Sequence, residues 1–268
     1  MLKEKKIQEL VSPWLEPEEY DIIRAAVYRF HSLMTKDFRK DNCFLIGDAA
    51  HQSPPFMGQG MMSGYRDSLN LSWKLISVLK NSFPSALLDS FEEERKPHSR
   101  FVVDGSAAIG KLMSAYADAV ERNQPSDVPQ ELIDRGYGSF ALPPLQNGIL
   151  FRGKSDSTSM AGSIFPQPLR MEGMECHERL DALLGKGFCI VSKKEVDLNS
   201  EQKEFYGQIN SKFLVLEESI LNSSSSLKEV MKKNDVYILR PDRHIFGSTS
   251  DKITFDDLTE DLKERLNF

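Results

Sequence analysis

The sequence predicts an α/β protein with two units joined by a linker. Three observations support this fold class. An apolar run at Cys43–Ile46 leads through a Gly/Pro-rich loop into a helical pattern of apolar residues. A stretch rich in Pro, Gly and Ser follows at residues 123–163. Beyond it, short apolar runs alternate with helical patterns. We therefore expect units at 1–122 and 164–268, with a linker at 123–163.

In the first unit, residues Lys3–Leu15 carry apolar residues at helical spacing, which predicts an amphipathic helix ending before Pro17. The alternating segment Asp21–Leu33 predicts a half-buried strand. The continuous apolar run Cys43–Ile46 predicts a short strand buried on both faces.

Gly47 and Asp48 end that strand, and the prolines and glycines after it predict a loop. From Met61 onward the spacing is helical, with an apolar set consisting of Met61, Met62, Tyr65, Leu69, Trp73, Ile76 and Leu79. We expect Met61 and Met62 to pack in the core. A helix that begins directly after a glycine loop offers unbonded N–H groups and partial positive charge to a polar ligand. Gly58 and Gly60 allow close approach of the backbone.

The run G-D-A-A-H-x-x-P-P-x-x-G-Q-G-M from Gly47, followed by G-x-R-D and N-L-x-W-K-L, resembles the second flavin-binding motif of FAD-dependent aromatic hydroxylases. The similar branch is that of 3-(3-hydroxyphenyl)propionate and phenol hydroxylases. The resemblance implies that Asp48 bonds a ribityl hydroxyl and that the prolines lie along the isoalloxazine. It also implies that N–H groups at the helix start face the flavin pyrimidine. The implied FAD-binding residues are Gly47, Asp48, Pro55, Gly58, Gly60, Met61 and Met62.

After this motif, helical patterns run from Ser85 to Tyr116, with Pro97 expected to interrupt or kink the helix. The unit from Ile164 reads β-α-β-α-β-β-α, which is thioredoxin-like. Its hairpin is expected to turn at Pro241-Asp242. The segment R-P-D-R resembles the R-P-D-G signature of the C-terminal thioredoxin-like domain in the same flavoprotein branch, with Arg243 in place of glycine. No redox C-x-x-C occurs, which argues against thiol exchange.

The resemblance implies an FAD-dependent monooxygenase that hydroxylates a phenolic substrate with NAD(P)H and O2. The family's N-terminal G-x-G-x-x-G unit does not occur in these 268 residues. The chain therefore resembles the C-terminal part of an FAD-binding α/β monooxygenase domain followed by a thioredoxin-like domain. Its expected partner is the missing N-terminal portion or a second copy in a homodimer. The alternative is a non-catalytic binding or assembly module, or a degenerate fragment. No side chain is a convincing catalytic acid or base.

Composition excludes several classes of partner and location for the protein. A net charge of −6 and a pI of about 5.5 argue against nucleic-acid and anionic-membrane partners. No apolar run approaches the roughly 20 residues of a membrane span, and there is no signal-peptide pattern. The few cysteines suit the cytoplasm, and Cys43 and Cys189 resemble small buried hydrophobes. We expect His51 to be a structural, hydrogen-bonded histidine rather than a metal ligand, and Arg66 and Asp67 to make local contacts.

Overall fold

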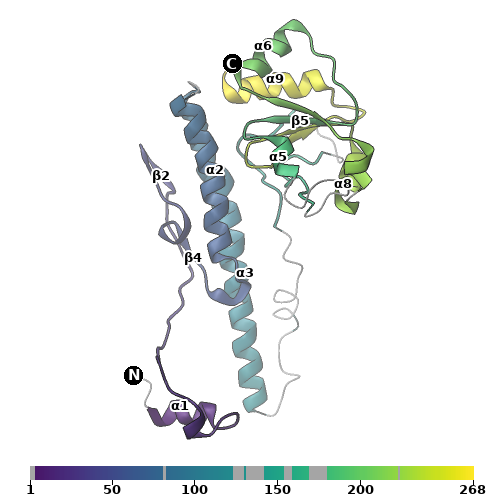
Figure 1. The fold of residues 1–268 in the computed structure, drawn as a ribbon. Helices are drawn as coiled ribbons and strands as arrows, with labels where there is room; N and C mark the ends of the chain where they lie inside the picture. The colour runs from purple at the N-terminus through teal and green to yellow at the C-terminus, as the bar shows by residue number, and fades with distance from the viewer. Residues whose placement is uncertain are drawn as a thin grey trace.

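The computed structural model describes residues 4–80, 83–122, 130, 142–153, 159–168, 180–222 and 224–268. Two long helices, α2 (Gly60–Lys80) and α3 (Ser90–Glu121), lie side by side along the molecule (Figure 1). Short N-terminal strands lie on one side of this pair, and a sheet with its own helices lies on the other. Much of the predicted linker falls outside the described residues.

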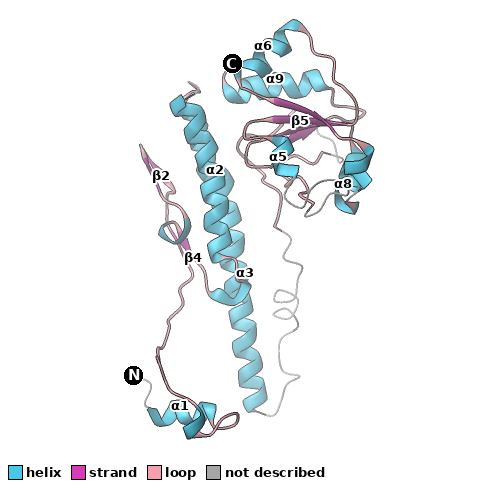
Figure 2. Cartoon of the chain, viewed as in Figure 1, coloured by secondary structure: helices cyan, strands magenta, loops and turns pink. Residues whose placement is uncertain are grey.

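The N-terminal part contains little regular structure before α2 (Figure 2). Helix α1 (Glu4–Val11) is followed by two antiparallel strand pairs. These pairs are β1 (Leu33–Met34) with β4 (His51–Gln52), and β2 (Arg39–Lys40) with β3 (Cys43–Phe44).

Two strand predictions for this part were wrong. Residues Asp21–Ser32 form no strand and are exposed, because only Leu33–Met34 has a neighbouring strand to pair with. The run Cys43–Ile46 is not buried on both faces: only Cys43–Phe44 is paired, Cys43 is exposed, and Leu45 and Ile46 are each 38% exposed.

The buried face of helix α2 is the opposite of the face that its apolar spacing predicts. Met61 is 70% exposed and Met62 is 42% exposed, so the prediction that they pack in the core was wrong. Tyr65, Leu69, Ile76 and Leu79 are exposed as well, and only Trp73 of the apolar set is buried. The buried face carries polar side chains instead, namely Ser63, Asp67, Asn70, Lys74 and Ser77, alongside Leu71 and Trp73. Three of these polar residues have partners on α3, which explains why they can be buried: Asp67 accepts from Arg95, and Asn70 and Lys74 donate to Glu94.

Helix α3 is continuous through Pro97, so that proline does not interrupt it. Before α3, the 3-10 turn Ser85–Asp89 places Leu87 and Leu88 in the interior. The buried residues of α3 include Glu94, Arg95 and His98, which face the polar side of α2.

The C-terminal unit has the predicted element order. Its helices are α5 (Leu180–Leu184), α6 (Ser200–Gln208), α7 (Glu218–Asn222), α8 (Ser225–Lys233) and α9 (Phe255–Leu266). Its strands are β5 (Cys189–Ser192), β6 (Lys212–Val215), β7 (Val236–Leu239) and β8 (Ile245–Ser248), arranged in the order β6-β5-β7-β8. Strand β5 is parallel to β6 and antiparallel to β7, and β7 and β8 form the predicted hairpin. This topology confirms the thioredoxin-like prediction.

Alternating side chains of this sheet build two cores. Ile190 and Ile238 face α6 and α9, whereas Cys189, Val191 and Leu239 face α5 and α8. The first core extends onto the long helices: Trp73 of α2 packs edge-to-face on Phe188 with ring centroids 5.7 Å apart. The first core therefore contains residues of both predicted units.

Candidate flavin site and the buried networks that hold it

The loop that carries the flavin-type motif lies directly on helix α2. Gly47 has a φ of +54°, in the left-handed region, and opens the 3-10 turn Gly47–Ala49. A Cβ added to Gly64 of α2 would lie 3.3 Å from the Cα of Gly47. The pair of glycines therefore allows the loop backbone and the helix backbone to approach each other closely.

Asp67 of α2 fastens this loop from behind. Its Oδ2 accepts hydrogen bonds from the Gly47 N–H at 3.0 Å and from His51 Nε2 at 2.8 Å. Its Oδ1 accepts one from Arg95 Nε of α3 at 2.8 Å. The side chains of His51, Asp67 and Arg95 are at most 3% exposed. Burial acts to raise the pKa of Asp67, but its bond from His51, the charge of Arg95 and the Gly47 N–H together hold that pKa below its ordinary value.

This network confirms that His51 is a structural histidine. It also shows that Asp67 does more than make the predicted local contact, since it joins the loop, α2 and α3. Arg66 donates to Gln59 Oε1 at 2.9 Å and forms no ion pair with Asp67 among the described residues. The sequence signal for Asp67 was the G-x-R-D segment, where the aspartate falls on the same helix face as Ser63 and Asn70.

The second half of the loop is held by α3. Residues Pro55–Met57 form a 3-10 turn (η3) that ends at Gly58, which has a φ of +62°. Ser106 of α3 donates a hydrogen bond to the Pro54 carbonyl. The Phe56 ring rests on Gly110 of α3, where an added Cβ would come within 2.5 Å of the ring. The position of the loop is therefore fixed from both helices.

The predicted cofactor-binding residues gather along this loop and the start of α2. Gly47 and Gly60 are half-buried, and Asp48, Pro55, Gly58, Met61 and Met62 are exposed. No hydrogen bond or ion pair of the Asp48 carboxylate is found among the described residues. Because α2 begins at Gly60, the N–H groups of Gly60, Met61 and Met62 belong to its first turn, where no intrahelical acceptor is available.

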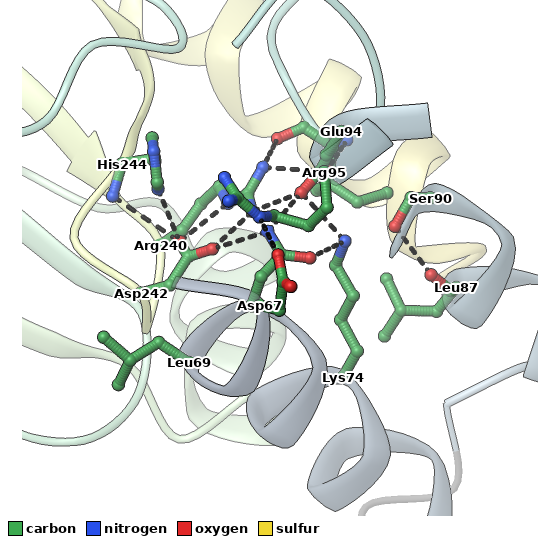
Figure 3. A network of polar contacts seen from close by, with 12 residues as sticks. Asp67, Leu69, Lys74, Leu87, Ser90, Glu94, Arg95, Arg240, Asp242 and His244 are labelled. Carbon is green, nitrogen blue, oxygen red and sulfur yellow. Dashed lines mark hydrogen bonds and ion pairs between the residues drawn. The ribbon is translucent and has the colours of Figure 1, made fainter. Parts of the chain in front are cut away.

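A second buried network joins the long helices to the C-terminal unit (Figure 3). Glu94 of α3 accepts hydrogen bonds from Asn70 at 2.6 Å and from Lys74 at 2.8 Å, both on α2. It also accepts two from Arg240, at 2.9 and 2.7 Å. Arg240 in turn bonds Asp242 through Nε at 3.0 Å and Nη2 at 2.6 Å.

Arg240 has an acceptor for every N–H group of its guanidinium, since Nη1 also donates to the Ile149 carbonyl at 3.0 Å. Arg240, Glu94 and Lys74 are at most 1% exposed. Burial opposes the charge of Glu94, but Arg240 and Lys74 outweigh it and lower the pKa of Glu94 to about 2. Burial is the main cause that lowers the pKa of Lys74 to about 8, with Arg240 acting in the same direction against Glu94.

Residues from two of the sequence motifs contact each other in this network. Asn70, Trp73 and Lys74 come from N-L-x-W-K-L, and Arg240 and Asp242 come from R-P-D-R. The Arg240 guanidinium lies over the Trp73 ring, 5.4 Å from its centroid. Arg243, which replaces the glycine of the signature, has a φ of +68°. No pattern in the sequence distinguishes Glu94 from its acidic neighbours.

The remaining site predictions concern metals, cysteines and membranes. Among the described residues there is no cluster of His, Cys, Asp and Glu that could hold a metal ion. Cys189 is buried, as predicted, and burial raises the pKa of its thiol to about 12. Cys43 is exposed, contrary to prediction. Within the described part of the chain, no helix has the length and apolarity required to cross a bilayer.

Known proteins share sequence and fold with this chain. Residues 6–106 match a family model described as "FAD binding domain". A 3-(3-hydroxy-phenyl)propionate/3-hydroxycinnamic acid hydroxylase from Mycolicibacterium vanbaalenii is 38% identical over 186 residues. That alignment covers 65% of this chain and 32% of the relative. The chain is thus similar in sequence to an FAD-binding domain and to part of an aromatic hydroxylase.

Other proteins match nearly the whole chain. A probable NADH-specific resorcinol 4-hydroxylase from Rhodococcus jostii is 28% identical over 96% of the chain and 49% of the relative. The crystal structure of aklavinone-11 hydroxylase with FAD and aklavinone shares the fold, with a TM-score of 0.63 at 21% identity, over 88% of this chain and 45% of that one. PieE in complex with FAD and substrate gives a TM-score of 0.63 at 19% identity, over 90% of this chain and 50% of that one. The chain thus spans half or less of the length of these relatives.

Proposed function

We propose that this chain is the flavin-facing portion of an FAD-dependent monooxygenase that hydroxylates a phenolic substrate with NAD(P)H and O2 in the cytoplasm. The observation that carries the proposal is the loop Gly47–Gly60. It presents an exposed carboxylate and the first turn of α2 on one face, and it is fastened from the other face by Asp67. Bound FAD would supply hydride acceptance from the nicotinamide and the activation of O2.

The residues of the loop fit the cofactor by their chemistry. The exposed Asp48 carboxylate can accept a hydrogen bond from a ribityl hydroxyl. No described atom lies within 4 Å of the place where a Gly58 Cβ would stand, which leaves room for a ligand against the backbone. The N–H groups of Gly60, Met61 and Met62 and the positive end of α2 favour negative charge on the pyrimidine edge.

Binding at this loop also depends on residues that do not face the cofactor. Asp67 fixes the Gly47 N–H and His51, and Ser106 fixes the Pro54 carbonyl. We assign these as positioning residues, because they hold the loop without lying on its exposed face. Preorganising such a loop reduces the ordering cost of ligand binding.

The proposal requires a dinucleotide-binding portion that carries G-x-G-x-x-G, whether it lies in the same polypeptide or another. The exposed apolar side chains on α2 supply a surface for it, since they remain uncovered in the described part of the chain; they are Met61, Met62, Tyr65, Leu69, Ile76 and Leu79. A contiguous apolar face of this kind is typical of a protein–protein interface. A second copy of the chain on the same face would instead indicate an assembly module.

Flavin retention tests the proposal. Residues 1–268 alone should purify without yellow colour, because contacts to the pyrophosphate and adenosine lie in the other portion. A nanomolar site is worth about 12 kcal/mol, and losing about half of it leaves a dissociation constant on the order of tens of micromolar, which is too weak to retain flavin through purification. Adding the dinucleotide-binding portion of the Mycolicibacterium vanbaalenii relative should restore stoichiometric flavin absorbance and phenol-dependent NAD(P)H oxidation.

A matched pair of variants locates the cofactor within that complex. Asp48→Ala should weaken FAD binding by roughly 1–3 kcal/mol, the cost of one lost hydrogen bond to a polar ligand. Asp251→Ala removes the same charge from an exposed position in the C-terminal unit and should leave FAD affinity unchanged. Equal affinity in both variants would remove Asp48 from the site. A complex that forms but never binds FAD would contradict the proposed function and favour the assembly module.

A further inference from the structure

A cavity of about 330 Å³ lies behind the start of α2, among α2, α3 and the C-terminal unit. Gln59, Arg66, His98, Ser163 and His244 supply its polar lining. None of the predicted flavin-binding residues lines it, and the described lining includes no aspartate or glutamate. The cavity is therefore separate from the predicted flavin site, and Arg66 gives its lining a positive charge.

His98 is part of the lining of this cavity and carries a buried hydrogen-bond donor. Its Nδ1 lies 3.1 Å from Arg95 Nη1, which can only donate, so Nδ1 must be the accepting nitrogen. Burial, Arg95 and His244 lower the pKa of His98 to about 4, so the ring is neutral at pH 7 and its proton is on Nε2. The His98 residue is 5% exposed, and among the described residues Nε2 makes no hydrogen bond of normal geometry, although the Pro143 and Pro144 carbonyls lie close enough to interact with the ring.

Arg66 contributes a second donor of the same kind. Its Nη2 donates to Gln59, while its Nη1 is buried and has no partner in the part of the chain that the structure describes. Burial and the nearby charge of Arg95 lower the pKa of Arg66, so an anion beside it would relieve an unfavourable environment. Two buried donors without acceptors are costly unless a ligand supplies the acceptors.

Part of the lining is apolar. Leu142, Pro143, Pro144 and Ile164 form an apolar wall, which we call the proline wall. The volume is at the lower end of the range for small-molecule sites and far exceeds that of a single water. A ligand with hydrogen-bond acceptor atoms and an apolar part would complement both the donors and the apolar wall of the cavity.

We propose that this cavity binds a small organic carboxylate, whose oxygens accept hydrogen bonds from Arg66 Nη1 and His98 Nε2 and whose apolar part packs on the proline wall. The site does not depend on flavin binding. Because Gln59 stands between Gly58 and Gly60, a ligand here contacts the back of the candidate flavin loop.

Calorimetric titration of the 268-residue chain with benzoate as the probe tests the proposal. We expect saturable binding at one site, at least about 10-fold tighter than binding of benzyl alcohol, which has the same ring without the charge. The His98 imidazole resonance should shift along the same binding curve. Inorganic phosphate that binds as tightly as benzoate would overturn the carboxylate assignment, and so would the absence of saturable benzoate binding.

Variants separate this site from general charge effects. Arg66→Met and His98→Leu should each weaken benzoate binding by roughly 10-fold or more, and His98→Gln, which keeps an N–H donor, should recover part of the loss. Arg100→Met removes an exposed charge from α3 outside the cavity and should bind benzoate like the wild type. If circular dichroism shows that Arg66→Met is unfolded, Arg66→Lys provides the test, since it keeps the charge and loses the guanidinium fork. Unchanged affinity in the folded Arg66 and His98 variants would refute the proposal.

Discussion

The C-terminal unit and the flavin-loop region are stabilised in different ways. The C-terminal sheet has a hydrophobic core on each face, with side chains such as Leu239 and Phe246 completely buried. The loop region has only a small cluster of Phe38, Ala50, Leu71 and Phe91. Its loop is instead held by buried charges, while its apolar side chains face outward. The apolar surface that a loop region would normally use for its own core is thus available for another portion of the protein.

The buried charges also connect the two regions, because Glu94 and Arg240 come from opposite sides of the junction. A buried ion pair contributes little net stability when intact, yet removal of one partner leaves uncompensated charge. The comparison therefore predicts that substitutions in the networks destabilise the fold far more than substitutions on the exposed apolar face.

The largest effect is expected for Arg240→Met. The substitution leaves the carboxylates of Glu94 and Asp242 buried with Lys74 as the remaining cation, which should cost roughly 3–5 kcal/mol in free energy of unfolding. Urea denaturation measures this cost. Lys193→Met is the matched control, because Lys193 pairs at the surface with Asp235, and about 0–1 kcal/mol is expected. Similar losses in both variants would show that the Arg240 network does not hold the junction.

Acid should weaken the same junction. The folded-state pKa of Glu94 is about 2, against an ordinary value of 4.5. A depressed carboxyl pKa contributes stability that is present above pH 4.5 and is lost as the pH falls toward 2. The loss should be on the order of 3 kcal/mol. Urea titrations across this window should show a shallower pH dependence in Glu94→Gln than in the wild type, and equal slopes would contradict the assignment.

Sequence patterns predicted the elements that depend on local periodicity. The sheet of the C-terminal unit, its hairpin at Pro241-Asp242 and helix α9 at Phe255–Leu266 all follow from alternating or helical apolar spacing. The structural role of His51 followed from the lack of neighbouring ligands. These features require no knowledge of distant residues.

The features that the sequence could not predict depend on partners far along the chain. The apolar spacing of α2 indicated its buried face wrongly, because Asn70 and Lys74 are buried against Glu94 on α3, which also binds Arg240, the residue directly after β7. The segment Asp21–Ser32 has the alternation of a strand but no neighbouring strand. The assignment of the flavin-binding residues remains a prediction for a similar reason, because their expected partner is a ligand and not another residue of the chain.

Asp67→Asn tests the network behind the flavin loop. One amide cannot accept from Gly47, His51 and Arg95 as the carboxylate does, so we expect a loss of about 1.5–3 kcal/mol. Hydrogen exchange at the Gly47 amide should accelerate as well. Asp48→Asn is the control on the exposed side of the loop, where the free energy of unfolding should change by less than about 0.5 kcal/mol. Equal stability of the two variants would mean that Asp67 does not fasten the loop.

The smallest effect is expected on the exposed apolar face of α2. Leu79 is 78% exposed, so Leu79→Ser should change the free energy of unfolding by less than about 0.5 kcal/mol. Leu262→Ala in α9, a completely buried position, should cost about 2–5 kcal/mol because it opens a cavity in the core. If the face is an interface, Leu79→Ser should nevertheless reduce binding of the dinucleotide-binding portion in a pull-down, while Leu262→Ala should not do so in conditions where it stays folded. A large loss of stability in Leu79→Ser would show that this face is already covered within the chain.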